Sequence, residues 1–360
     1  MSTAVLEIQE TIRSVPNHPQ PPVAEQTAPP EGVLNQLFLG SLGAQAVYVA
    51  AKLGISDLLN DGSKTVEQLA IATNTHAPSL YRILRALASL HIYNETHNKT
   101  FSLTPVAELL RSDAPNSFRD VAIFMGEDWH WQVWGQTLHS VKTGEPAWSK
   151  VHGKDVFPYF EANREASRIF DNAMSSFSQI AIEAVASAYD FQGMGTLVDI
   201  AGGHGRLLTG ILDRNPEMNG VLFDQPHVIA DARDTVAASS AAERVELVGG
   251  DFFANVPAGG DAYMMKHIIH DWDDERAIKI LSNVKKAMNP KGRVLLIEAV
   301  IETGNKQDFG KLIDIEMLVS PGGKERTALE YSEIFAKAGL RLKRIVKTQS
   351  PYSVIEAVCQ

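Results

Sequence analysis

The sequence has a single cysteine, a shortage of basic residues and no long apolar run. Cys359 cannot form an intrachain disulfide, so we expect a reducing, cytoplasmic environment. The 33 Lys and Arg are outnumbered by 43 Asp and Glu, and the net charge of -10 repels a phosphate backbone. No segment approaches the roughly 18 apolar residues of a membrane span, and no basic, apolar leader opens the chain. We therefore expect a soluble protein without a nucleic-acid partner, a membrane partner or a metal site.

The 360 residues, 44% of them hydrophobic, are enough for two cores. The first 30 residues are polar and rich in proline, and such a segment buries too little surface to order itself. Aromatic residues are concentrated in a mainly helical stretch after residue 105, where most rings would form a core and some would line a pocket for a flat molecule. The predicted parts are a disordered tail (1–30), an N-terminal domain (31–115), a helical linker and pocket segment (116–190) and an α/β domain (191–360).

The N-terminal domain begins with a segment, residues 33–59, in which apolar residues recur at helical spacing on both faces. A helix that is apolar all round must be buried on every side, so this helix predicts packing against a second subunit. Helix, turn, helix and hairpin then follow in the order of a winged helix. Such a module could bind DNA through Arg82 and Arg85 or form a dimer, and the acidic composition favours the dimer. The winged-helix elements are expected at 66–73, 77–90, 91–94 and 100–103.

Strands alternate with helices after Phe191, which predicts a parallel sheet covered by helices on both faces. The last two strands are joined by a turn too short for a parallel crossover, so they are expected to form an antiparallel hairpin. The seven predicted strands are 196–200, 220–223, 245–248, 262–268, 293–300, 341–348 and 352–358.

The carboxyl ends of the first three strands carry residues suited to a nucleoside cofactor. The first ends in a glycine-rich turn, residues 199–205, although this turn lacks the third glycine of the dinucleotide motif. The second ends at Asp224, whose carboxylate could accept hydrogen bonds from two ribose hydroxyls. The third is followed by Asp251 and Phe252, a carboxylate for an adenine amino group and a ring to cover the base. Each signal alone is weak, but together they favour a cofactor site at this edge of the sheet.

The fourth strand leads to His270, which would lie in the same crevice. Histidine has a reference pKa of about 6.5, which suits removal of a proton near neutrality. Glu298 follows the fifth strand and could reach the imidazole, where a carboxylate fixes the tautomer and favours the protonated form.

Five segments of the chain resemble the plant caffeate and acetylserotonin type of class I O-methyltransferase. They are Leu197 to Gly205, Phe223 to Val228, Gly249 to Phe253, Lys266 to Trp272 and Pro321 to Thr327. The resemblance covers essentially the whole chain after the tail, because members of this family also carry an N-terminal winged-helix dimerisation domain. It implies a Rossmann-like, seven-stranded methyltransferase domain, a homodimer, S-adenosylmethionine as cofactor and S-adenosylhomocysteine as product.

The resemblance also implies roles for individual residues. His270 would be the general base, with Glu298 and Glu325 beside it. The residues that would bind the cofactor are Asp199, Ala201, Gly202, Gly203, Gly205, Asp224, Asp251, Phe252 and Lys266. The residues that would bind the acceptor are Trp134, Phe170, Met174, Phe177, His267, Asp271 and Met317.

Three positions depart from the family pattern. Ala201 replaces the first glycine of the turn, which is tolerated if the residue keeps a negative φ. Phe177 replaces a histidine, and Ser320 stands where an asparagine is common, after a shortened segment. The last two changes concern the acceptor, so they argue against transferring a lignin-pathway acceptor to this chain.

We expect an S-adenosylmethionine-dependent O-methyltransferase that acts on a phenolic or enolic hydroxyl of a small aromatic molecule. Aliphatic alcohols are too weakly acidic for an imidazole to ionise easily. One alternative is a ligand-sensing winged-helix regulator, which would need a basic face on residues 77–90. Another is a family member with decarboxylase or hydroxylase chemistry, which the joint presence of His270, Glu298 and Glu325 disfavours.

Overall fold

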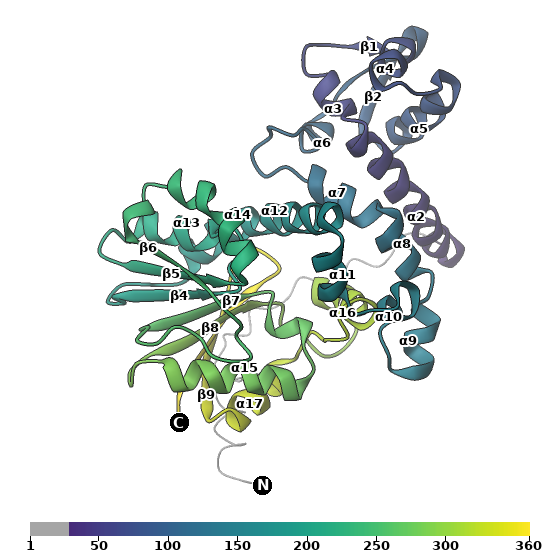
Figure 1. Ribbon diagram of the computed structural model, residues 1–360. Coiled ribbons are helices and arrows are strands. Elements are labelled where there is room, and N and C mark those ends of the chain that lie inside the picture. The colour runs from purple at the N-terminus through teal and green to yellow at the C-terminus, as the bar shows by residue number, and fades with distance from the viewer. Residues whose placement is uncertain (1–28) are drawn as a thin grey trace. The chain divides into compact units, whose positions relative to one another are not determined.

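The computed structural model describes residues 29–360, so the predicted tail lies almost entirely outside the described residues (Figure 1). The chain divides into two compact units, residues 1–43 and 44–360. The described part of the first unit is the N-terminal half of one long helix, and the second unit contains the other helices and the strands of residues 29–360.

The first helix of the described residues, α2, spans Pro30–Lys52 and ends two residues before Gly54, whose left-handed backbone (φ 65°) does not continue a helix. The prediction that no segment could span a membrane is wrong by length and composition, because α2 meets both criteria. This is weak evidence for a membrane, since core helices and N-terminal signals meet the same criteria. Large apolar side chains are exposed along its first half, namely Leu34, Leu37, Phe38, Leu39 and Leu42.

A small winged-helix fold follows α2. Thr65 begins the second of its helices with a capping box, in which its hydroxyl accepts from the Gln68 amide and the Gln68 side chain accepts from the Thr65 amide. The hairpin starts two residues later than predicted, because His91 takes a left-handed turn conformation (φ 59°). The short β1, which was not predicted, pairs antiparallel with β3. The elements are α3 (Ile55–Leu58), β1 (Lys64–Thr65), α4 (Val66–Thr73), α5 (Ala77–Ser89), β2 (Tyr93–Thr96), η1 (His97–Lys99) and β3 (Thr100–Leu103).

Seven helices occupy the stretch predicted to be helical between the two domains. Aromatic rings form much of their core: Trp129 and Trp148 lie edge to face with centroids 6.0 Å apart, and Phe160 stacks on Phe170 at 4.7 Å. The helices are α6 (Pro105–Glu108), α7 (Arg119–Gly126), α8 (Asp128–Trp134), α9 (Thr137–Thr143), α10 (Ala147–His152), α11 (Val156–Ala162) and α12 (Arg164–Ala188).

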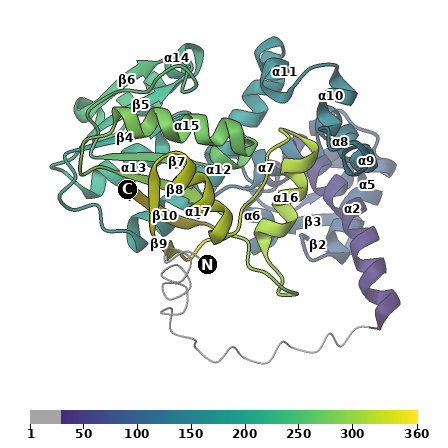
Figure 2. The same cartoon turned by 90° about the horizontal axis from the view of Figure 1, so that it is seen from below.

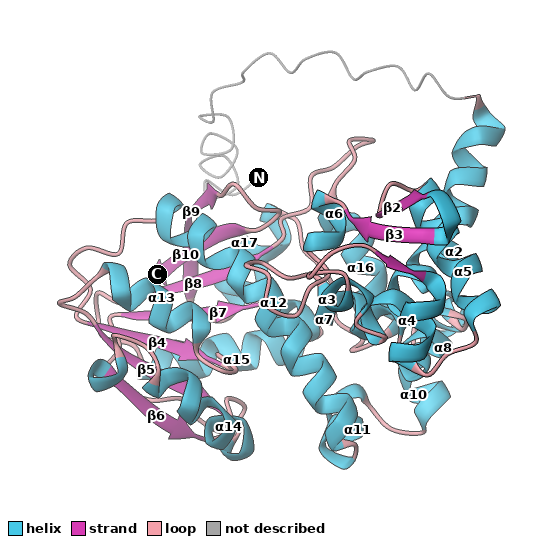
Figure 3. Cartoon of the chain, turned by 90° about the horizontal axis from the view of Figure 1, so that it is seen from above, coloured by secondary structure: helices cyan, strands magenta, loops and turns pink. Residues whose placement is uncertain are grey.

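A seven-stranded sheet in the order β6-β5-β4-β7-β8-β10-β9 forms the centre of the C-terminal domain (Figure 3). The first five strands in this order are parallel, and β10 is antiparallel to both of its neighbours. All seven predicted strands and the terminal hairpin are confirmed. The strands are β4 (Thr196–Ile200), β5 (Asn219–Asp224), β6 (Val245–Gly249), β7 (Ala262–Lys266), β8 (Arg293–Glu298), β9 (Leu340–Lys347) and β10 (Ser353–Cys359).

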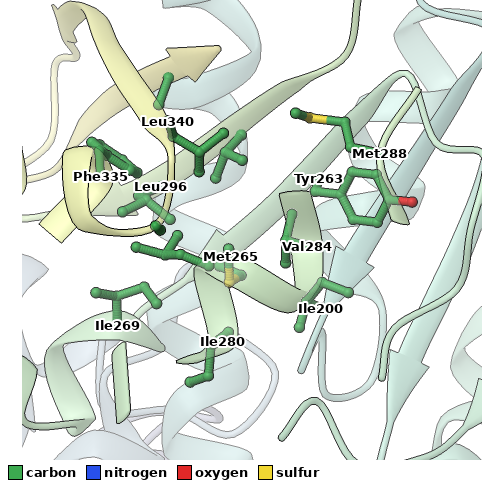
Figure 4. Close-up of a cluster of buried hydrophobic side chains, with 14 of the residues drawn as sticks. Ile200, Tyr263, Met265, Ile269, Ile280, Val284, Met288, Leu296, Phe335 and Leu340 are labelled. Atoms are coloured by element: carbon green, nitrogen blue, oxygen red, sulfur yellow. The ribbon is translucent and has the colours of Figure 1, made fainter. Parts of the chain in front are cut away.

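Each face of the sheet packs against helices over a separate apolar core. One core joins the sheet to the end of α12 and to α13 and α14, and the other joins it to α15 and α17 (Figure 1). Met265 and Leu296 from the sheet meet Ile280 and Phe335 in the second core (Figure 4). The helices of this domain are α13 (Arg206–Arg214), α14 (Pro226–Ala237), α15 (Asp274–Ala287), α16 (Phe309–Val319) and α17 (Ala328–Lys337).

β7 and β8 each end two residues earlier than predicted, and both differences shape the functional edge of the sheet. β7 stops at Lys266 because His267 adopts a left-handed backbone (φ 56°), after which the short 3₁₀ turn η3, Ile269–Asp271, carries His270. β8 stops at Glu298 instead of residue 300. His270 and Glu298 are therefore both presented at the carboxyl ends of adjacent parallel strands.

Candidate active site

His270 is buried and held by carboxylates on both sides of its ring. Its Nδ1 donates to Glu325 Oε1 over 2.6 Å, and Glu298 Oε2 lies 3.5 Å from the same nitrogen. Its Nε2 lies 3.4 Å from Asp271 Oδ1. Because Nδ1 carries the hydrogen of the short bond, Nε2 is the nitrogen that can take a proton from an acceptor.

The backbone on both sides of the imidazole is fixed by carboxylates, Glu298 on one side and Asp314 on the other. Glu298 Oε1 accepts from the amides of Ile268 and Ile269, at 3.1 and 2.9 Å, so the η3 turn is tied to the end of β8. The Glu325 amide donates to Asp314 Oδ1 over 2.8 Å, which ties the loop before α17 to α16. The Glu298 carboxylate is therefore placed by hydrogen bonds that do not involve the imidazole, and the backbone of Glu325 is held by Asp314.

The sequence analysis gave no role to Arg326, which the structure places beneath η3. Its side chain is fully buried, and its guanidinium donates to the carbonyl oxygens of Ile269 and Trp272 and to Asp274. A guanidinium has five N–H donors, so it can bind several carbonyl oxygens of one turn at the same time. The only sequence signal was the position of Arg326 within the Gly-Gly-Lys-Glu-Arg-Thr segment.

The charges around His270 are strongly coupled. Burial opposes a charge on the imidazole, but the three carboxylates around it raise the pKa of His270 to about 10. Burial raises the pKa of Glu298 to about 7 and that of Asp271 to about 6. The cluster therefore has a high proton affinity, and the imidazole of the free enzyme is protonated near neutrality.

The glycine-rich turn after β4 has a backbone that the sequence analysis did not expect. Ala201 has a φ of 54°, so the condition of a negative φ, under which alanine would replace glycine without strain, is not met. The Ala201 amide donates to the carbonyl oxygen of Phe223 over 2.7 Å, which holds the chain in this conformation as it leaves β4. Gly203 and Gly205 also have positive φ values, of 58° and 76°. Left-handed residues therefore alternate with residues of negative φ along this turn, which bends over the end of the strand.

The acidic residues at the strand ends suit a ligand that brings hydroxyl or ammonium donors. Asp224 accepts from the amides of Gly203 and Gln225, at 2.9 and 2.7 Å, and burial raises its pKa. The buried Asp199 Oδ2 has no hydrogen-bond partner within residues 29–360, and burial raises the pKa of Asp199 to about 8. Buried carboxylate oxygens without partners are costly, so a bound nucleoside with donors would satisfy them.

Lys266, Asp251 and Phe252 lie at the neighbouring strand ends, as predicted from the sequence. Burial lowers the pKa of Lys266 to about 8, and its Nζ contacts His267 Nδ1 at 3.1 Å. Asp251 Oδ1 accepts from the amide of Phe253 over 2.8 Å. The residues present thus match a cofactor with ribose, base and amino-acid parts spread over β4, β5 and β6.

Two family models match the chain: an O-methyltransferase domain over residues 134–341 and an O-methyltransferase dimerisation domain over residues 35–113. The chain belongs to the O-methyltransferase family. It is 44% identical to the phenazine O-methyltransferase of Lysobacter antibioticus, over 91% of this chain and 96% of that protein. It is 33% identical to the phenazine-1-carboxylate N-methyltransferase of Pseudomonas aeruginosa, over 87% of this chain and 92% of that protein.

Solved structures agree with these matches. The crystal structure of LaPhzM has a TM-score of 0.89 and 43% identity, over 92% of this chain and 100% of that chain. An O-methyltransferase from neocarzinostatin biosynthesis, solved with S-adenosylmethionine and 2-hydroxy-5-methyl naphthoic acid, has a TM-score of 0.76 and 30% identity, over 88% and 96%. The predicted family and fold class are thereby confirmed, and the cofactor of this O-methyltransferase family is S-adenosylmethionine.

The predicted acceptor residues of this O-methyltransferase fall into groups. Phe170 and Met174 lie one turn apart on α12, and Phe170 contacts Phe124 edge to face at 5.7 Å. Phe177 is half-buried one turn further along α12. Their roles in binding stay predictions.

Trp134 and Met317 lie on α8 and α16. The Trp134 indole donates to Glu316 Oε2 over 2.7 Å, and the Met317 side chain is buried one residue further along α16. The Trp134 indole thus binds Glu316, a contact that was not predicted from the sequence.

The last predicted acceptor residues, His267 and Asp271, flank the base. The ring of His267 stacks on that of His270 with centroids 5.3 Å apart, and burial lowers the pKa of His267 well below its usual value. Its Nε2 points to no hydrogen-bond acceptor within the described residues, and the Tyr352 ring lies 4.2 Å away, edge to face. His267 is thus an uncharged ring that packs against His270.

The donor atoms of His270, Glu298 and Glu325 all lie within 4.8 Å of one another, a set that could also hold a metal ion. Because the imidazole of this O-methyltransferase is protonated near neutrality, the two carboxylates already have a cation between them. A metal ion would have to displace that proton.

Proposed function

We propose that this chain methylates a phenolic or enolic hydroxyl of a planar aromatic molecule, with His270 as the general base. The main support is the orientation of the imidazole, whose Nδ1 is held by Glu325 at 2.6 Å, while Nε2 has only the longer contact of 3.4 Å with Asp271 and is the nitrogen that can meet an acceptor. S-adenosylmethionine supplies an electrophilic methyl group on a sulfonium centre. The residues of the chain have to place the acceptor oxygen in line with that group and remove its proton.

The protonated cluster around His270 still allows base catalysis. A complex of a phenol with a neutral imidazole contains the same number of protons as a complex of a phenolate with an imidazolium. The same complex therefore forms whether the acceptor binds as the phenol or as the phenolate. The carboxylates favour the second arrangement, because they stabilise the imidazolium. His270 then keeps the proton at Nε2 while the phenolate oxygen is methylated.

The acceptor is proposed to be a flat, fused or substituted aromatic molecule. Rings on α8, α11 and α12 form a continuous aromatic cluster near Met174, and such surfaces pack well against planar ligands. A phenazine relative and a naphthoic acid complex among the similar proteins are consistent with this class. A ring nitrogen is a second candidate acceptor, because one relative is an N-methyltransferase.

We also propose that the chain acts as a homodimer. The match to a dimerisation domain covers most of α2, whose exposed apolar side chains would be buried against a second copy. This assignment disfavours the DNA-binding regulator, and a cytoplasmic location stays a prediction.

The proposal is tested by incubating the protein with isotopically labelled S-adenosylmethionine and a panel of phenols, hydroxyphenazines, hydroxynaphthoates and phenazines without a hydroxyl. Mass spectrometry of the products then locates the label. Label on oxygen of a hydroxyl substrate supports the proposal. Label only on ring nitrogen, or turnover that does not need the methyl donor, would overturn it.

A further inference from the structure

A second buried ion pair lies outside the catalytic cluster, between α8 and α16. The His130 side chain has no exposed surface, and its Nε2 lies 2.9 Å from Glu316 Oε1. Its Nδ1 lies 3.4 Å from the carbonyl oxygen of Met125. A carbonyl oxygen only accepts, so both ring nitrogens face acceptors. Burial opposes a charge on the ring, but Glu316 raises the pKa of His130 and so favours the imidazolium. The sequence analysis assigned no role to either residue.

Glu316 receives two further hydrogen bonds, which complete the set around its carboxylate. The Trp134 indole donates to Oε2 over 2.7 Å, and the Ser320 hydroxyl donates to Oε1 over 2.6 Å. A carboxylate with three donors, one of them charged, is well compensated for its burial. The network therefore has one favoured geometry. Removing one partner leaves the other with a buried charge or hydrogen-bonding group that is not compensated.

The network joins the two segments that would enclose the acceptor. α16 lies beside α9 and α10 and leads into the loop that returns to α17 (Figure 2). On α16, Met317 follows Glu316 directly, and Asp314 holds the backbone amide of Glu325. On the other side, the His130 ring packs against Phe124 at 4.4 Å. A shift of α16 along α8 would thus move Met317, on the acceptor side, together with Glu325, which contacts the base.

We propose that His130 and Glu316 are positioning residues that hold α16 in register with α8, and so fix the width of the acceptor pocket and the position of Glu325. The inference rests on the proposed function, because it assigns Met317 to the acceptor side and Glu325 to the base. Neither residue of the pair touches the reacting atoms. Their effect is on acceptor KM and on kcat, and not on binding of the cofactor at the far strand ends.

The test compares Glu316→Gln, His130→Gln and the double variant with the wild type. Each single variant is expected to raise acceptor KM about tenfold while cofactor Kd stays as in the wild type, since coupled buried pairs carry energies of this order. The double variant restores an uncharged hydrogen-bonding pair, so it should lose less than the product of the two single effects. Arg214→Ala, which removes the exposed ion pair with Glu183, is the matched control and should leave acceptor KM unchanged.

Ser320→Ala provides a milder variant if the others fail to fold, because it removes only one hydrogen bond to Glu316. It should raise acceptor KM by about threefold. Folded variants with a wild-type acceptor KM, whatever their melting temperature, would overturn the proposal, as would single effects that simply multiply in the double variant. All KM values are taken with the acceptor that the wild type methylates. Failure of every hydroxyl acceptor with the wild type would instead count against the proposed function.

Discussion

Gly323 lies directly against the carbonyl oxygen of His270, so closely that a Cβ on Gly323 would overlap that oxygen and the backbone of the next peptide. The neighbouring Lys324 amide donates to the same carbonyl oxygen over 2.8 Å. The loop that carries Glu325 is therefore pressed onto the turn that carries the base, and a side chain at position 323 has no room there.

Gly323→Ala is expected to displace one of these two segments and to lengthen the bond between Glu325 and His270. We expect kcat to fall by at least about tenfold, since small misplacements of catalytic groups cost this much or more, while cofactor Kd is unchanged. Steady-state kinetics and calorimetric titration with S-adenosylhomocysteine measure the two quantities. Arg214→Ala is the control, because it removes only an exposed ion pair with Glu183. Equal kcat in the two variants would contradict the close approach described here.

His270→Ala is expected to lower kcat by roughly 10²- to 10⁴-fold, the usual contribution of a general base. Cofactor Kd should not change, because the groups expected to hold the ribose and the base of the cofactor lie at the ends of β4, β5 and β6. Acceptors whose hydroxyl is already ionised should be affected less than ordinary phenols. A wild-type kcat in this variant would exclude His270 as the base.

The positions of the strands along the chain were predictable from the sequence, because each parallel strand is an apolar run that ends in turn residues. The cluster of His270 and Glu298 followed from that pattern, since both residues end adjacent strands. The network of His130 and Glu316 could not be predicted, because its members are 186 residues apart and belong to helices without a distinctive pattern. The left-handed conformation of Ala201 was missed for a different reason: a short hydrogen bond to the next strand overrides the local preference of alanine.

The pH dependence should show a base that is hard to deprotonate. A raised pKa means that the neutral imidazole appears only at alkaline pH, so kcat/KM for a phenol should rise with pH toward about 10, the pKa of His270 in the free enzyme. Glu298→Gln removes one of the charges that raise this pKa, so the ascending limb should move to lower pH. A series of acceptors with different hydroxyl pKa values shows which part of the pH profile comes from ionisation of the enzyme and which from ionisation of the acceptor. A limb that stays fixed in Glu298→Gln would contradict the electrostatic role of Glu298.

Removal of metal ions is expected to leave turnover unchanged. The carboxylates of Glu298 and Glu325 already face the proton-bearing nitrogen of His270, so a divalent ion would have to compete with that proton. Dialysis against EDTA followed by assay, with and without added Mg²⁺ or Zn²⁺, measures this directly. Loss of activity that one of these ions restores would show that the three residues act as metal ligands.

Ala201→Gly is expected to stabilise the protein, against the general rule that glycine weakens a fold. A left-handed alanine costs roughly 1–2 kcal/mol, and glycine removes this cost while adding about 0.4–1 kcal/mol of chain entropy to the unfolded state. The net gain is about 0.5–1 kcal/mol, which for a chain of this size raises the melting temperature by about 1–2 °C. Ala336→Gly, at an exposed position inside α17, is the matched control and should lower it, because glycine there has only the entropic effect. If both substitutions lower the melting temperature equally, the conformation at position 201 carries no strain.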